Sequence, residues 1–114
     1  MIKRTNDFNI NIRTNLKAGV GDIHITEFID REEMINCRLL CEQVVPVGGS
    51  IGQHIHKYET EFYLIRKGLG KVIEQDGSHE VGPGDVVITG HGEMHSIENI
   101  GAEDLVMTAI IVTH

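Results

Sequence analysis

Residues 53–61 read Gln53-His54-Ile55-His56-Lys57-Tyr58-Glu59-Thr60-Glu61, and the fold and function inferred from this chain depend on this stretch. On an extended strand, His54 and His56 point to the same face and lie roughly 6.6 Å apart along the chain. Two imidazoles placed in this way can reach one metal ion. After a short bend, Glu61 begins the next expected strand and can return a carboxylate to the same point. The stretch therefore predicts a metal site, although alternating histidines alone are also typical of a polar strand face.

A further histidine, His95, lies far along the chain, just after the glycine-rich turn at residues 90–92. Together with His54, His56 and Glu61 it gives a set of three imidazoles and one carboxylate. Such a set suits one divalent transition metal, namely manganese, iron, nickel, copper or zinc. It suits calcium badly, because calcium prefers oxygen ligands only. An octahedral ion held by these groups keeps positions open for a substrate, water or dioxygen.

Glycines and prolines divide the chain into short apolar runs, and no long stretch has a helical period. Many short strands at such spacing are typical of an all-β sandwich or barrel. The expected strands are Asp22–Phe28, Cys37–Val45, Ile51–His56, Thr60–Arg66, Gly70–Gln75, Ser78–Val81, Asp85–Thr89, Met94–Glu98 and Leu105–Val112. Asp30 and Glu33 form a capping-box pattern, which predicts at most one short helix. The polar segment before Gly21 is expected to be an arm with no assigned place in the fold.

Two spaced patterns resemble the sequence motifs of the cupin family. The first runs without a gap through Gly48, His54, His56, Glu61 and Gly68. The second runs through Gly84, Gly90, Gly92, His95 and Asn99, with Gly90 where the family usually has proline. Fifteen residues separate the two patterns, which is near the short end for cupins. The resemblance covers residues 48–99 in detail and the flanking strands only in character.

The resemblance implies an all-β, cupin-type double-stranded β-helix, or jelly-roll barrel, with the metal inside. Residues 1–114 would form a single cupin domain, with residues 1–36 as an N-terminal arm and outer strand and residues 37–114 as the barrel core. The four metal ligands carried over are His54, His56, Glu61 and His95. Glu59 is the rival carboxylate, since it shares a face with Glu61 on an extended chain.

Strand parity indicates what surrounds the site. In residues 37–45 the odd positions carry no charge, so they are expected to face the barrel interior, and the even positions, including Arg38, to face outward. This places Gln43 inside, and the same argument places Tyr63 beside the metal as a pocket residue. Tyr63, Glu59 and His91 are candidates for a catalytic role by position only.

The expected pocket walls are mostly aliphatic. We expect no inward arginine pair, because only Arg66 and Lys71 flank the strands that carry the site. This expectation disfavours phosphosugar isomerases.

Composition excludes several classes of protein. A net charge of -7 argues against nucleic acid as a partner, because phosphate binding needs clustered lysines and arginines. No apolar run approaches the roughly 20 residues that span a bilayer, so no membrane association is expected. The N-terminus lacks the apolar region of a signal peptide, and a cytoplasmic location is the default. Cys37 and Cys41 would lie about 13 Å apart on a strand, too far for a disulfide.

The last strand predicts an oligomer. Residues 105–112 are apolar on both faces apart from Thr108, whereas a closed barrel needs only one apolar face. Either the segment Ile23–Phe28 covers the outer face or a second copy does. The resemblance to small cupins, which commonly pair through this sheet, favours a homodimer.

Two functions remain open. The first is a metal-dependent enzyme that acts on a small organic molecule by oxygenation, decarboxylation or isomerisation, with the metal as a Lewis acid. The second is a non-enzymatic protein that binds or senses a small ligand through the metal. The first is favoured because stand-alone cupins with all four ligands resemble enzymes more often.

Overall fold

The computed structural model describes residues 1–114, and it contains strands and single-turn 3-10 helices only. The strands are β1 (Asn9–Thr14), β2 (Asp22–Glu27), β3 (Cys37–Val45), β4 (Ser50–Ile55), β5 (Glu59–Lys67), β6 (Gly70–Glu74), β7 (Gly77–Val81), β8 (Val86–Gly90), β9 (Met94–Asn99) and β10 (Leu105–Thr113). The 3-10 helices are η1 (Thr5–Asp7), η2 (Leu16–Ala18) and η3 (Arg31–Glu33). The all-β prediction is therefore confirmed. No helix has the length and apolar character that a membrane crossing requires.

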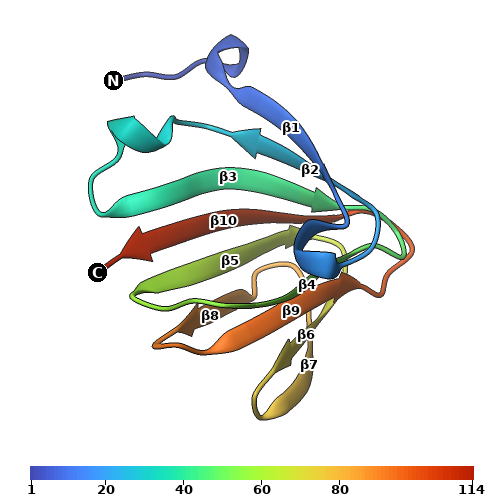
Figure 1. Cartoon of the computed structure of the whole chain (residues 1–114). Helices are drawn as coiled ribbons and strands as arrows, with labels where there is room; N and C mark the ends of the chain where they lie inside the picture. Colours follow the sequence, from blue (N-terminus) through green and yellow to red (C-terminus); the bar gives the residue numbers. More distant parts are fainter.

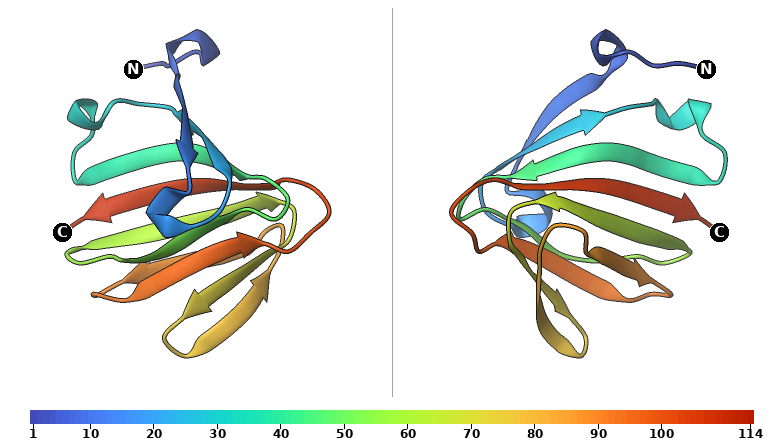
Figure 2. Two further views of the ribbon diagram at one scale, coloured as in Figure 1. Left: turned by 45° about the vertical axis from the view of Figure 1, so that its right-hand side comes forward. Right: turned by 180° about the vertical axis from the view of Figure 1, so that it is seen from behind.

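The strands form two antiparallel sheets that face each other as a jelly roll (Figure 1). The larger sheet has the order β1-β2-β3-β10-β5-β8, and the smaller sheet has the order β4-β9-β6-β7. β10 occupies the middle of the larger sheet, where it pairs with β3 on one side and β5 on the other. Figure 2 shows the same two layers from two further directions, with β1 and β2 at one end of the larger sheet.

Side chains alternate across the larger sheet as the sequence predicted. Cys41, Gln43 and Val45 of β3 are buried between the sheets, and Tyr63 of β5 is buried with them. Both cysteines are free thiols, as expected. Burial raises the pKa of the Cys41 thiol to about 12, so this side chain stays protonated and unreactive at neutral pH.

The N-terminal segment differs from the expected arm, because residues 9–14 form a strand. β1 pairs with β2 along its whole length, from Asn9 opposite Glu27 to Thr14 opposite Asp22. Its inward positions are polar, and Asn11 donates a hydrogen bond to Glu27 at 3.0 Å. Its apolar residues, Ile10 and Ile12, point outward and are exposed. A strand with polar residues inside and apolar residues outside reverses the usual pattern, which is why the sequence did not reveal it.

The connection from β1 to β2 crosses to the smaller sheet, where η2 lies against β4 (Figures 1 and 2). A bridge between Val20 and Ser50 fastens this crossing, with both backbone hydrogen bonds formed. The two backbones touch at Gly52, where an added Cβ would lie 1.9 Å from the carbonyl oxygen of Lys17. Lys17 and Ala18 both adopt positive φ angles, which non-glycine residues rarely do. The 3-10 turn is therefore held in a strained conformation against β4.

The predicted short helix is present as η3. Asp30 and Glu33 form the expected capping box, and the Asp30 backbone N–H donates to the Glu33 carboxylate at 3.4 Å. The helix is a single 3-10 turn, because Met34 already has extended backbone angles.

We expect Gly52→Ala to destabilise the fold by about 1–3 kcal/mol, because the new methyl group collides with the Lys17 carbonyl and displaces η2 from β4. Urea denaturation followed by circular dichroism measures the loss. Gly82→Ala is the matched control, since its Cβ would meet only a flexible Leu69 methyl group at 3.3 Å. Equal unfolding midpoints for the two variants would contradict the backbone contact.

Candidate metal centre

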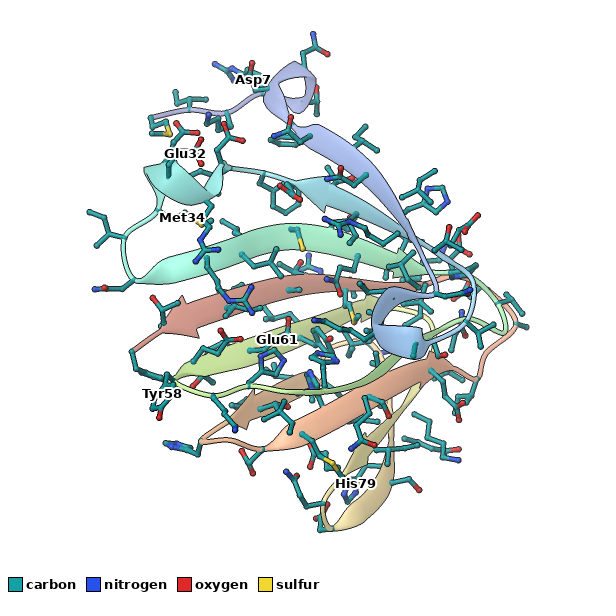
Figure 3. All side chains as sticks on the ribbon, viewed as in Figure 1. Asp7, Glu32, Met34, Tyr58, Glu61 and His79 are labelled. Carbon is teal, nitrogen blue, oxygen red and sulfur yellow. The ribbon has the colours of Figure 1, made fainter.

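Three strands from both sides of the barrel bring the four predicted ligands together. His54 lies near the end of β4 and pairs directly with His95 of β9. His56 follows β4, and its backbone is held by hydrogen bonds to Glu93 and Gly92. Glu61 enters from β5 of the larger sheet, and Figure 3 shows it in the interior between the two sheets. The site therefore joins the two layers of the barrel.

The ligating atoms of these residues converge on one point. His95 Nε2 lies 2.9 Å from His54 Nε2 and 3.1 Å from His56 Nε2. Glu61 Oε1 lies 2.9 Å from the Nε2 atoms of both His56 and His95, and 3.5 Å from that of His54. All four atoms lie within 4.8 Å of one another.

The outer nitrogen of each imidazole has an oxygen partner that can accept a hydrogen bond. His54 Nδ1 lies 2.8 Å from the Gly52 carbonyl oxygen, which can only accept a hydrogen bond. His56 Nδ1 lies 2.6 Å from a carboxylate oxygen of Glu59. His95 Nδ1 lies 2.8 Å from the Thr89 hydroxyl, which can accept as well. With the proton of each ring on Nδ1, the Nε2 lone pairs are directed inward, as metal binding requires.

Four electron-pair donors that converge in this way are suited to hold a cation between them. Two ligand atoms about 2.1 Å from one ion and at right angles are separated by about 3.0 Å. The observed separations of 2.9–3.1 Å match adjacent positions around one such ion. Three imidazoles and one carboxylate fit a divalent transition metal, so the residues present suit the group that the sequence predicted.

Burial strengthens the electrostatics of the cluster. Only 1–3% of the His56, Glu61 and His95 side chains is exposed. Burial alone would raise the pKa of Glu61, but the three surrounding imidazoles outweigh it and lower that pKa, so the carboxylate stays ionised. Burial lowers the pKa of His95 and keeps the ring neutral. Burial would also lower the pKa of His56, but Glu61 and Glu59 raise it.

A cavity of about 270 Å³ lies beside the cluster inside the barrel. Its walls are lined by Arg13, Leu16, Lys17, Ile25, Glu27, Arg38, Leu39, Gln43, Ile51, His54, Ile55, His56, Glu61, Tyr63 and Ile111. The prediction of mostly aliphatic walls with few charges is wrong, because only seven of the fifteen lining residues are hydrophobic. The expected absence of inward arginines is wrong, because Arg13 and Arg38 line the cavity together with Lys17.

Two physical features explain why the sequence missed these cations. Arg13 and Lys17 belong to β1 and η2, in the segment that was expected to be an arm. Arg38 was placed outside by strand parity, but β3 has a register shift beside it. Leu39 pairs with Ile111 and Cys37 pairs with the next residue of β10, so Arg38 is an extra residue in the ladder. Such a β-bulge turns a side chain toward the opposite face.

The other candidate residues lie in different places. Gln43 and Tyr63 line the cavity, and the Oε1 atom of Gln43 is buried without a hydrogen-bond partner. The Tyr63 ring stacks on His95 at 5.0 Å between centroids, and burial raises the pKa of its hydroxyl well above the usual value. Glu59 contacts Arg38 and the outer nitrogen of His56, and its carboxylate is not among the converging ligand atoms. His91 and Tyr58 line a separate hollow on the surface. Tyr58 lies in the turn between β4 and β5 (Figure 3).

The comparison with known proteins identifies the class of protein. The cupin domain model matches residues 41–111, and the chain belongs to this family. An oxalate-binding protein from Thermotoga maritima is 34% identical over 113 residues, which cover 98% of this chain and 93% of that protein.

Solved structures are similar over most of the chain. A crystal structure from Thermotoga maritima, described as that of a predicted oxalate decarboxylase, has a TM-score of 0.93 and 32% identity and covers 100% of both chains. The Cnp3 cupin domain of Schizosaccharomyces pombe has a TM-score of 0.75 at 17% identity, over 93% of this chain and 70% of that one. The second likeness concerns the fold alone.

We expect His56→Ala to lower the metal content of purified protein sharply while the barrel stays folded, because the core around it is otherwise aliphatic. Elemental analysis gives the metal content, and circular dichroism gives the fold. His24→Ala is the control, since His24 is exposed on β2 and lies outside the cluster. Equal metal content in both variants would show that the cluster is not the binding site.

Proposed function

We propose that this chain holds one divalent transition metal at His54, His56, Glu61 and His95 and binds a small carboxylate on that metal inside the barrel. The metal is manganese, iron, nickel, copper or zinc. The observation that carries the proposal is the convergence of four ligand atoms beside a cavity with cations in its wall. A 34% identical relative named an oxalate-binding protein supports the choice of ligand class.

The charge of the cavity wall supports an anionic ligand. The chain as a whole carries a net charge of -7, so a local group of cations is not explained by composition. Arg38 is paired with Glu59, but Arg13 and Lys17 have no carboxylate at ion-pair distance. A metal and two unpaired cations in a cavity of about 270 Å³ suit a small mono- or dicarboxylate.

The metal would polarise a bound carboxylate as a Lewis acid. The residues of the chain would orient the ligand and keep water away from it. Ile51, Ile111 and Leu39 supply apolar walls, and the Gln43 amide offers a buried polar atom that has no partner within the protein.

The positions of the catalytic candidates favour binding over turnover. Both oxygens of Glu59 are engaged by Arg38, and His91 lies outside the cavity. The Tyr63 hydroxyl has a raised pKa and therefore resists proton loss. Of the three, only Tyr63 lines the cavity, so proton exchange with a ligand there would depend on a hydroxyl that holds its proton tightly.

Decarboxylation is the second candidate function. Glu27 is the one carboxylate of the cavity wall that is neither in the ligand cluster nor in an ion pair, and its side chain is the candidate for proton transfer with a ligand. The structural relative described as a predicted oxalate decarboxylase supports decarboxylation as a candidate reaction. Carbon dioxide release from oxalate, with oxygen uptake followed in parallel, separates a decarboxylase or an oxygenase from a binding protein.

We expect calorimetry to detect oxalate binding by the metal-loaded chain and none by the metal-free chain. The double variant Arg13→Gln/Lys17→Gln should bind at least about tenfold more weakly, because two cations of the wall are lost. The double variant Lys67→Gln/Lys71→Gln is the matched control, since it removes the same charge outside the cavity. Equal losses in both variants would mean that net charge, not the cavity wall, attracts the ligand.

We also propose that the chain is a homodimer paired through the outer face of the larger sheet. The pairing registers place many apolar residues of β3, β10, β5 and β8 on this face: Leu40, Val44, Phe62, Leu64, Val86, Ile88, Val106 and Ile110. Ile10 and Ile12 of β1 lie on the same face beyond the polar residues of β2. β2 does not cover these residues, because it extends the sheet beyond β3. A patch of this extent is rare on a monomer, and two-fold pairing is the commonest way to bury it. A cytoplasmic location remains a prediction.

Light scattering should give twice the 12.7 kDa mass of one chain. Ile110→Glu should convert the dimer to a folded monomer, because a buried charge opposes an interface of more than about 1,000 Å². Ile73→Glu, on the smaller sheet and 41% exposed, is the control and should remain dimeric. A monomeric wild-type chain would rule the proposal out.

A further inference from the structure

Glu59 lies two residues before Glu61 on β5, yet it takes no part in the ligand cluster. Its Oε2 atom accepts a hydrogen bond from His56 Nδ1 at 2.6 Å. Arg38 donates to both of its oxygens, from Nε to Oε1 and from Nη2 to Oε2, each at 2.7 Å. The Glu59 side chain is only 13% exposed, so water competes little for these bonds. The three residues form a continuous chain of hydrogen bonds that ends at a candidate metal ligand.

The backbone of β3 is shaped so that this chain can form. Regular alternation would point Arg38 away from the interior, opposite to Leu39. The bulge between the Leu39–Ile111 and Cys37–Val112 pairs leaves Arg38 unpaired in the ladder and directs its guanidinium to the cavity side. β-bulges are common beside functional sites, where they re-aim a side chain.

His56 has more need of such a partner than the other two histidines. His54 and His95 lie within strands that pair with each other, whereas His56 lies just beyond the end of β4. Its ring is also the only one whose Nδ1 faces a charged partner, since His54 faces a carbonyl and His95 a hydroxyl. A carboxylate on the outer nitrogen orients an imidazole ligand and makes it a stronger electron-pair donor.

We propose that Arg38 and Glu59 are positioning residues that fix the ring of His56 and thereby set the metal affinity of the site. Glu59 acts on His56 directly, and Arg38 acts only through Glu59. The fork of Arg38 also keeps Glu59 away from the metal position, although Glu59 and Glu61 share one face of β5. The inference rests on the proposed metal site.

Competition with a chromophoric chelator gives the affinity of the apo chain for Zn²⁺ in each variant. Glu59→Ala should weaken Zn²⁺ binding about 10–100-fold. Glu59→Gln should lose less, because the amide oxygen can still accept the hydrogen bond from Nδ1. Arg38→Ala should weaken binding by a smaller factor, and Arg38→Ala/Glu59→Ala should match Glu59→Ala to within about twofold, since Arg38 has no other route to the ligand.

Two further measurements separate positioning from a general loss of structure. The thermal unfolding of each apo variant reports the fold, and the visible absorption of the Co²⁺-loaded chain reports the ligand field at the metal. The Co²⁺ spectrum should shift in Glu59→Gln and Glu59→Ala. Glu98→Gln is the matched control, because Glu98 pairs with Lys71 on the exposed side of the smaller sheet. It should leave both the affinity and the spectrum unchanged.

The outcomes are distinct for the two levels of proposal. A wild-type chain that binds no Zn²⁺ overturns both the proposed function and this inference. A wild-type chain that binds Zn²⁺ while Glu59→Ala binds within about twofold of it overturns the inference alone. Losses in Arg38→Ala and Glu59→Ala that multiply in the double variant also overturn it, because Arg38 would then act independently of Glu59.

Discussion

The convergence of four electron-pair donors on one point is the constraint around which the interior of this barrel is arranged. His54, His56 and His95 each place Nδ1 within hydrogen-bond distance of a fixed oxygen, and their Nε2 atoms are directed toward one another. Glu61 adds an ionised carboxylate, whose Oε1 lies 2.9 Å from His56 Nε2. Because the donors come from both sheets, a cation between them would join the two layers from within. The Gly52 carbonyl, the Thr89 hydroxyl and the Arg38–Glu59 pair all serve this one arrangement.

The sequence revealed the parts of the site that follow strand parity and short-range spacing. His54 and His56 alternate on one strand, and the inward placement of Gln43 and Tyr63 follows from the same rule. The inward placement of Arg38 was not predicted, because one extra residue in β3 locally reverses the alternation of side chains. The Arg38 side chain itself gives no sign of this change. The place of Arg13 in the cavity wall was not predicted, because β1 turns its polar residues inward and its apolar residues outward. Both failures concern backbone pairing, which depends on residues far away in the sequence.

The larger sheet uses its two faces for different purposes. Its inner face carries Glu61, Tyr63 and Gln43, whereas its outer face is mostly apolar over β3, β10, β5 and β8. β10 contributes to both, since Met107 and Ala109 are fully buried while Val106 and Ile110 point outward. The inward apolar residues of this strand therefore belong to the core of the barrel, and its outward ones belong to the face proposed for pairing.

The crossing of β1 and η2 over the cavity has a consequence for which parts of the site can change independently. The metal cluster lies within residues 41–111, the part that the family shares, whereas the three cations of the wall lie before residue 41. The four residues of the cluster and the cations of the cavity wall thus lie in separate stretches of the chain. A change of charge at Arg13 or Lys17 would alter the cavity wall while the four residues of the cluster stay in place.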